Sequence, residues 1–215
     1  MRKRLSIKTR RPDLSRSEFR HYYETCHVPL GLSFINHFKW LRYVRNHVRS
    51  SSGSLITFDC YAEFWVADDA DDEALYGFLR SEDFRRLDLD DRQFLDISRR
   101  LSFEVREVVL LPAQATSPGR HNKAVLMWKQ GANPREVAEM AASRIVSALT
   151  DQLHFAALDV ALPPVPEESP FDAFLSLEYK GSAPLAMDSS LLPQARWALV
   201  EVDPVETPPE KLAVA

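Results

Sequence analysis

Residues 58–66 read Phe-Asp-Cys-Tyr-Ala-Glu-Phe-Trp-Val, and this stretch decides the fold class. Apolar and polar side chains alternate along it, which predicts a β-strand with two different faces. One face carries Phe58, Cys60, Ala62, Phe64 and Val66, and the other carries Asp59, Tyr61, Glu63 and Trp65. The apolar face should pack against helices. We expect the mixed face to look into a barrel, together with Lys8, Arg10, Tyr43, Arg45 and His47 from neighbouring strands.

A helix precedes this strand in the sequence. Ser15 and Glu18 form a capping box, which marks a helix start, and an apolar stripe follows at Phe19, Tyr22, Tyr23 and Cys26. Pro29 disfavours helical geometry at the residue before it, so the helix should end there. His27 would then lie in the last turn, where the helix dipole favours a protonated imidazole. The alternative is a histidine that only caps the final carbonyls.

The same order of elements occurs twice. Before a polar linker at residues 112–119, strands are predicted at 5–10, 40–48, 58–66 and 102–111, with helices after Ser15 and at 71–79. After it, strands are predicted at 123–130, 154–162, 171–179 and 196–202. A helix capped by Asn133 lies between the first two of these strands, while residues 181–194 hold two prolines, so a second helix there is short or lost.

This order predicts an α+β fold built from two tandem ferredoxin-like βαββαβ units. Each unit would place its helices on one face of an antiparallel sheet, and the two sheets would cover each other as a pseudo-dimeric α+β barrel. The predicted domains are residues 1–112 and residues 120–206. The ionisable residues concentrate in the first of these, which favours one active half and one supporting half.

Composition narrows the function classes. The chain has 215 residues, a formal net charge of -4 and a pI of about 5.9, and no basic stripe, so nucleic-acid binding is not expected. No apolar run approaches the ~20 residues that span a bilayer, and no signal peptide is recognisable, so we expect a cytoplasmic protein. Two cysteines fit a reducing compartment. The acidic run at residues 68–73 is typical of a solvated helix start, and no metal or cofactor motif is apparent.

A family resemblance covers roughly residues 4 to 110. It rests on Lys8-Thr-Arg-Arg-Pro-Asp-Leu-Ser15 with Glu18 and Phe19, His27-Val-Pro-Leu30, Leu41 to Val48, Phe58-Asp59 with Ala62 to Trp65, and Leu89-Asp-Asp91 with Phe94 and Asp96. With these residues the first half resembles the EthD family of the dimeric α+β barrel superfamily. The second half lacks the His-x-Pro-Leu element and looks like a degenerate second copy of the fold.

The resemblance implies a fold more than a reaction. EthD-like proteins include accessory proteins of ether breakdown and small enzymes acting on lactones or polyketides, and the wider superfamily includes isomerases, cyclases, decarboxylases and cofactor-free monooxygenases. Most work as homodimers, so a homodimer of this two-repeat chain is a further expectation. Because one fold hosts many chemistries, the site residues have to carry the functional argument.

His27 is the candidate general acid/base, and Asp91 or Asp59 would orient it or share the proton transfer. Tyr43 and His47 would hold the substrate oxygen, while Trp65 and Phe34 would stack on an apolar or aromatic substrate. Arg10 and Tyr61 complete the predicted substrate-binding set. The alternatives are that Asp59 and His47 are paired structurally or face water, and that the Asp88–Asp91 run caps a loop.

The leading hypothesis is a cofactor-independent acid/base enzyme of the lyase, decarboxylase, isomerase or cyclase type, acting on a small aromatic, lactone or polyketide-like substrate. The rival hypothesis is a non-catalytic accessory or ligand-binding protein of an oxygenase or degradation pathway. A cofactor-free monooxygenase is the third. An acid/base enzyme should show a bell-shaped dependence of rate on pH, whereas a ligand-binding protein need not.

Overall fold

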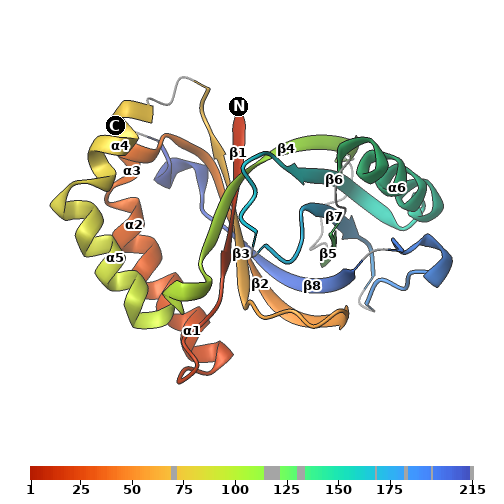
Figure 1. Cartoon of the computed structure of the whole chain (residues 1–215), viewed down its shortest axis with the longest axis horizontal. Coiled ribbons are helices and arrows are strands. Elements are labelled where there is room, and N and C mark those ends of the chain that lie inside the picture. Colours follow the sequence, from red (N-terminus) through yellow and green to blue (C-terminus); the bar gives the residue numbers. More distant parts are fainter. Residues whose placement is uncertain are drawn as a thin grey trace. The chain divides into compact units, whose positions relative to one another are not determined.

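The computed structural model describes residues 1–68, 72–113, 122–129, 134–167, 169–181, 184–194 and 196–213. Its strands are β1 (Arg2–Lys8), β2 (Trp40–Gly53), β3 (Cys60–Val66), β4 (Leu101–Leu111), β5 (Asn122–Trp128), β6 (Leu153–Ala161), β7 (Ala173–Tyr179) and β8 (Trp197–Glu206). The fold is mixed α+β (Figure 1). The strands follow one another in the order β1-β3-β2-β8-β5-β7-β6-β4 of a closed barrel. Within the described residues, no helix combines the length and apolarity needed to cross a lipid bilayer.

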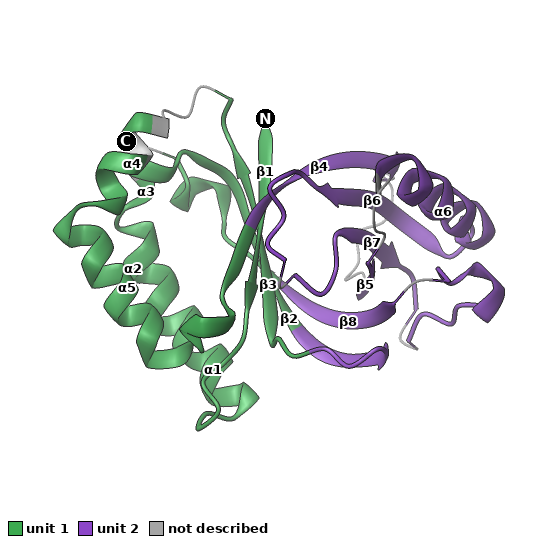
Figure 2. Cartoon of the chain, viewed as in Figure 1, with its two compact units in different colours: residues 1–47, 57–102, 205–215 green, residues 48–56, 103–204 purple. Residues whose placement is uncertain are grey.

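The chain divides into two compact units (Figure 2). Unit 1 contains residues 1–47, 57–102 and 205–215, and unit 2 contains residues 48–56 and 103–204. The long strand β2 therefore contributes to both units. Most of the predicted linker, residues 114–119, lies outside the described part of the chain.

In unit 1, β3 pairs antiparallel with β1 and with β2. Cys60 and Ala62 of β3 pack against Phe19 and Phe94 of the helices, which confirms the predicted apolar face. Side chains directly opposite each other on paired strands share a face.

The predicted grouping of strand faces is wrong in one respect. Tyr43 lies opposite Phe64 and His47 lies opposite Cys60, so both project toward the helices and not with Tyr61 and Trp65. Lys8 also lies opposite Cys60. Alternation within a strand divides its residues between two faces, but the register between strands decides which faces coincide.

The first helix does not end at Pro29 as predicted. α1 (Arg16–Tyr22) begins at the predicted capping box, and a π-helical turn (Tyr23–His27) then leads directly into α2 (Val28–Leu32). Within the π-turn the Val28 N–H bonds to the Tyr23 carbonyl, five residues back. Pro29 occupies the first turn of α2, where a missing N–H costs least. His27 consequently lies inside a continuous helical segment, and the argument from a helix C-terminus does not apply to it.

Five further helical elements are described in unit 1. They are α3 (Ile35–Phe38), α4 (Asp72–Leu79), α5 (Glu82–Phe94) and 3-10 turns at Ile97–Arg99 and Pro209–Lys211. The sequence pattern missed α5, because this helix is charged at most positions and its buried residues are only Asp91 and Phe94. Ser81 caps it, with its Oγ accepting a 3.2 Å hydrogen bond from the Phe84 N–H.

Two backbone hydrogen bonds tie the end of α5 to the segment that follows β1. The Arg11 N–H donates to the Phe94 carbonyl at 2.9 Å, and the Asp96 N–H donates to the Thr9 carbonyl at 2.9 Å. This junction fixes the position of Lys8, the last residue of β1, relative to the C-terminal turn of α5.

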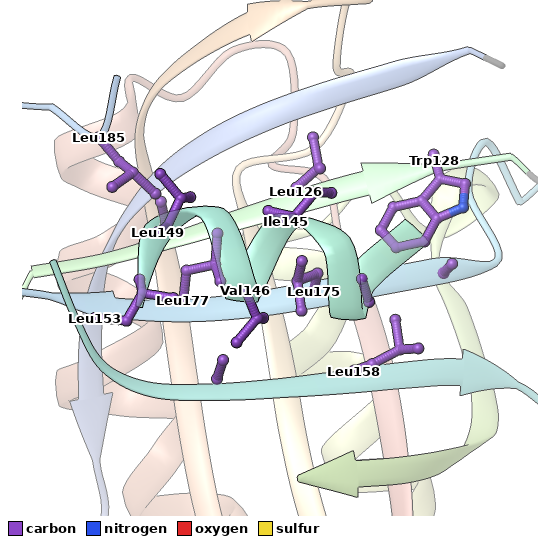
Figure 3. Packing of buried hydrophobic residues seen from close by; sticks show 14 of the residues in the cluster. Leu126, Trp128, Ile145, Val146, Leu149, Leu153, Leu158, Leu175, Leu177 and Leu185 are labelled. Atoms are coloured by element: carbon purple, nitrogen blue, oxygen red, sulfur yellow. The ribbon is translucent and has the colours of Figure 1, made fainter. Parts of the chain in front are cut away.

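Unit 2 contains the sheet order β8-β5-β7-β6, and all three pairings are antiparallel. α6 (Pro134–Leu149) packs Ile145 and Leu149 onto Leu126, Leu175 and other buried apolar residues of the sheet (Figure 3). Between β7 and β8, the described residues form one short 3-10 turn, Ser189–Leu191. This agrees with the prediction that a second helix is short or lost there.

Candidate active site

The π-helical turn of unit 1 positions the central side chains of the candidate site. Tyr23, Glu24 and His27 all come from this turn, and each bonds to a different element. π-Helical turns are rare and often occur at functional sites, because they change the direction of side chains within an otherwise regular helix.

His27 forms a carboxylate–imidazole pair with Asp90 of α5. The His27 Nδ1 lies 2.7 Å from Asp90 Oδ2, and Tyr22 donates a 2.7 Å hydrogen bond to Asp90 Oδ1. Burial opposes the charge on Asp90, but the hydrogen bonds from His27 and Tyr22 outweigh it and lower the pKa of this carboxyl. Burial, and then the neighbouring Asp90, raise the pKa of Tyr22 to about 12, so its hydroxyl stays a donor.

The two ring nitrogens of His27 differ in their contacts. Nε2 has no hydrogen-bond partner among the described residues, while Nδ1 bonds to Asp90. A carboxylate at Nδ1 holds the proton on that nitrogen and leaves a lone pair on Nε2, which is the arrangement of a general base. The rings of Phe94 and Tyr23 lie 4.9 and 5.4 Å from the His27 ring, centroid to centroid, and restrict its rotation.

Asp91, the carboxylate predicted to orient His27, lies further from the imidazole than Asp90 does. Its Oδ1 is 3.6 Å from His27 Nδ1 and has no hydrogen-bond partner, while its Oδ2 is bound by Arg100 at 2.6 Å. Arg100 also approaches Asp88 at 3.9 Å. Asp91 therefore contributes a second negative charge beside His27 and fixes Arg100 close to the pair.

Tyr43 and His47 lie on the strand side of the same helical turn. The Tyr43 and Tyr23 hydroxyls are 3.0 Å apart, and His47 Nε2 lies 2.6 Å from Glu24 Oε1. Arg45 donates to Glu24 at 2.9 Å. The burial of Glu24 would raise the pKa of its carboxyl, but hydrogen bonds from His47 and Arg45 overcome this effect and lower it.

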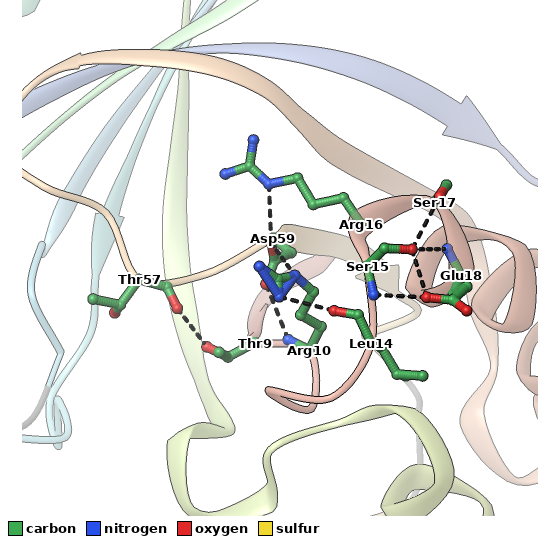
Figure 4. A network of polar contacts seen from close by, with 9 residues as sticks. All are labelled: Thr9, Arg10, Leu14, Ser15, Arg16, Ser17, Glu18, Thr57 and Asp59. Carbon is green, nitrogen blue, oxygen red and sulfur yellow. Dashed lines mark hydrogen bonds and ion pairs between the residues drawn. The ribbon is translucent and has the colours of Figure 1, made fainter.

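Asp59 and Arg10 belong to a separate polar network at the start of α1 (Figure 4). Asp59 Oδ2 accepts a 3.1 Å hydrogen bond from the Arg10 backbone N–H, and its Oδ1 lies 3.3 Å from Arg10 Nε and 3.2 Å from Arg16 Nε. These contacts neutralise the carboxylate and tie β3 to the start of the helix. No described contact joins Asp59 to His27.

The remaining predicted residues are dispersed. Tyr61 and Trp65 are buried on the sheet face opposite the helices, and the Trp65 ring is flanked by Lys3 Nζ at 4.3 Å and the Arg42 guanidinium at 4.6 Å. Phe34 packs against Phe78 in an aromatic cluster, with ring centroids 5.6 Å apart. The structure therefore brings His27 and Asp91 together, with Tyr43 and His47 adjacent, and places the other predicted residues elsewhere.

Sequence reasoning missed Asp90, Tyr22, Lys8 and Arg100. The Leu89-Asp-Asp91 motif contained the partner of His27, but without α5 the two aspartates could not be told apart.

An open cavity of about 320 Å³ lies at the start of α5, lined by residues 79–82, 84, 85 and 88. Asp88 belongs to both this cavity and the Arg100 contact. No group of three His, Cys, Asp or Glu side chains among the described residues has the spacing of a metal site.

Comparison with known proteins gives one family and several similar folds. The family model of the EthD domain matches residues 11–98. An anthrone oxidase-like protein superposes with a TM-score of 0.52 at 10% identity, covering 95% of this chain and 92% of that one. A proposed monooxygenase from Fusobacterium nucleatum subsp. nucleatum gives a TM-score of 0.47 at 9% identity, covering 94% and 91% of the two chains. A search of curated proteins gave no significant match.

Proposed function

We propose that the protein is a cofactor-independent acid/base enzyme of the EthD family, whose domain model matches residues 11–98. The observation that carries the proposal is the His27–Asp90 pair, in which Nδ1 is bound to a carboxylate and Nε2 has no partner among the described residues. The reaction would be of the lyase, decarboxylase, isomerase or cyclase type.

In the proposed mechanism, His27 Nε2 removes a proton from carbon next to a carbonyl, or from a phenol. Asp90 stabilises the imidazolium that forms, and Tyr22 keeps Asp90 in place. His27 then returns the proton to another atom of the substrate or to a leaving group. A positioned acid/base of this kind contributes about 10²–10⁴-fold to rate.

The proposed substrate is a small aromatic, lactone or polyketide-like molecule. Such molecules carry acidic C–H or O–H groups beside carbonyls, which suits a single imidazole base near neutral pH. We assign Tyr43 and His47 a supporting role, because their hydrogen bonds go to Tyr23 and Glu24 of the π-turn. Phe34, Trp65, Tyr61 and Arg10 remain predictions as substrate contacts. Asp59 remains a prediction as a catalytic carboxylate.

We also propose that the chain is a tandem repeat of ferredoxin-like units, with domains at residues 1–112 and 120–206. The strand order of unit 2, β8-β5-β7-β6, supports this, since numbering its strands along the chain gives the order 4-1-3-2 of a split βαβ motif. The proposed enzyme is cytoplasmic and acts on a small molecule. Light scattering after gel filtration would test whether two such chains form a homodimer.

Solvent exchange tests the proposed function without knowledge of the full reaction. A panel of phenolic ketones, lactones and β-dicarbonyl compounds would be incubated in D₂O, and deuterium incorporation would be followed by mass spectrometry. We expect enzyme-dependent exchange that is lost in His27→Ala and kept in His21→Ala, an exposed histidine on the same helix. Exchange that is equal in both variants contradicts the assignment of His27.

The similarity in fold to an anthrone oxidase-like protein makes a cofactor-free monooxygenase the second candidate, and the same panel of compounds can test it. An oxygen electrode in the same panel distinguishes the two, because proton transfer alone consumes no oxygen. Binding of a panel compound with neither exchange nor oxygen uptake would favour the accessory-protein alternative.

A further inference from the structure

Lys8 is a buried cation beside the candidate site. It is the last residue of β1 and only 6% exposed. Its Nζ makes no hydrogen bond or ion pair with any described residue, although an ammonium group has three donors. A charged group that is buried without hydrogen bonds is costly to a protein, so such a group is uncommon unless a ligand or water uses it.

Lys8 and His27 both border the ring of Tyr23. Its Nζ lies 5.5 Å from the centroid of the Tyr23 ring, and the His27 ring is 5.4 Å from the same centroid. Burial lowers the pKa of Lys8, and the nearby Asp91 carboxylate partly offsets this. The junction between Thr9 and Asp96 holds β1 at the C-terminal turn of α5, so this arrangement is part of the backbone framework.

We propose that Lys8 is a second catalytic group, whose ammonium donates hydrogen bonds to the oxyanion formed when His27 removes a proton. The substrate is then a neutral phenol or an enolisable ketone that passes through a phenolate or enolate. This inference rests on the proposed function, because the substrate becomes an oxyanion only if His27 removes its proton. Lys8 is the residue that would then stabilise that negative charge.

The step balances without a further reactant. The substrate O–H or C–H bond breaks, its proton moves to His27 Nε2, and its electron pair remains on the substrate as a phenolate or enolate oxygen. Lys8 keeps its own proton and acts through charge and hydrogen bonding, in the manner of an oxyanion-stabilising donor. His27 returns the proton, and both side chains end in their starting states.

Equilibrium binding of 4-nitrophenol tests this role without turnover, because its phenolate form absorbs visible light. We expect the wild-type protein to bind the phenolate at least about tenfold more tightly than the phenol, equivalent to about one unit in the pKa of the bound probe. Lys8→Met should lose this preference, and Lys8→Arg should keep most of it. Lys129→Met, which removes a half-exposed lysine of unit 2, should behave as wild type.

A second measurement covers the case in which Lys8→Met does not fold. In the wild-type protein, bound 4-nitrophenolate should protect Lys8 from reductive methylation and leave Lys129 unprotected, as read by peptide mass spectrometry. Equal methylation of Lys8 with and without the probe, an unchanged phenolate preference in Lys8→Met, or a wild-type preference for the neutral phenol would each overturn the proposal. Loss of phenolate preference in Lys8→Met, together with normal solvent exchange in His27→Ala, would support the role of Lys8 and reject only that of His27.

Discussion

The Nδ1 atom of His27 lies 2.7 Å from Oδ2 of Asp90 and 3.6 Å from Oδ1 of Asp91. The two carboxylates are adjacent in the sequence but have different partners. Asp90 also accepts a hydrogen bond from Tyr22, whereas Asp91 is bound to Arg100. The helix α5 thus presents one carboxylate that orients the imidazole and one that holds a cation nearby.

Asp90→Asn should lower kcat by about 10²-fold, since an amide at this position no longer stabilises an imidazolium. Asp91→Asn should cause a smaller loss, because its contact with His27 is longer. Both rates would be measured on the best substrate of the exchange panel. An Asp91→Asn defect larger than that of Asp90→Asn would reverse the assignment of the two carboxylates.

His27→Ala should lower kcat by about 10²-fold or more while the protein keeps its far-UV circular dichroism and cooperative unfolding. A histidine with only a structural role would behave differently, lowering the melting temperature and leaving the turnover of the folded fraction near wild type. His47→Ala serves as the comparison, since His47 is bonded to Glu24 of the same π-turn. We expect that variant to lose stability more than turnover.

Tyr43→Phe should lower the free energy of unfolding by about 1 kcal/mol, because it removes the buried hydrogen bond to Tyr23. For a chain of this size the melting temperature should fall by roughly 2–4 °C. KM should change little if the hydroxyl has a supporting role. A large rise in KM at unchanged stability would instead support the sequence-based prediction that Tyr43 contacts the substrate.

Stability should fall as the solution is acidified from about pH 5 to about pH 3. Glu24 and Asp90 both have pKa values below their ordinary values of 4.5 and 3.8. A lowered pKa in the folded state gives stability that is present above the ordinary value and lost as pH falls through the folded one. Urea unfolding at several pH values would measure how steeply the free energy of unfolding falls with pH. This fall should be shallower for Glu24→Gln than for wild type, and equal slopes would mean that Glu24 contributes nothing to the pH dependence of stability.

The order of elements could be predicted from the sequence, because alternation and caps are local signals. The strand at residues 58–66, the capping box at Ser15 and the helix between the first two strands after the linker all appear near their predicted positions. The missed helix, α5, lacks a wide apolar stripe, so nothing local distinguished it from a charged loop.

The candidate site was predictable only in part, because it depends on register and on one unusual turn. The π-turn lets a helical segment continue through Pro29 and directs His27 toward α5. No simple periodic pattern in the sequence predicts such a turn. The register between β2 and β3 placed Tyr43 and His47 beside the helices. Lys8 was visible in the sequence, but its burial without a hydrogen-bond partner became clear only in three dimensions.

The return of the C-terminal segment to unit 1 has a consequence for how the protein is made. Thr207 bonds to the Tyr43 carbonyl and to Arg45, and Leu212 is part of the core around Phe19. A gene truncated after residue 112 would therefore encode unit 1 without its last segment. The ribosome must therefore translate residues 205–213 before the unit that carries His27 is complete, so we expect residues 1–112 alone to be less stable than the same residues in the longer chain.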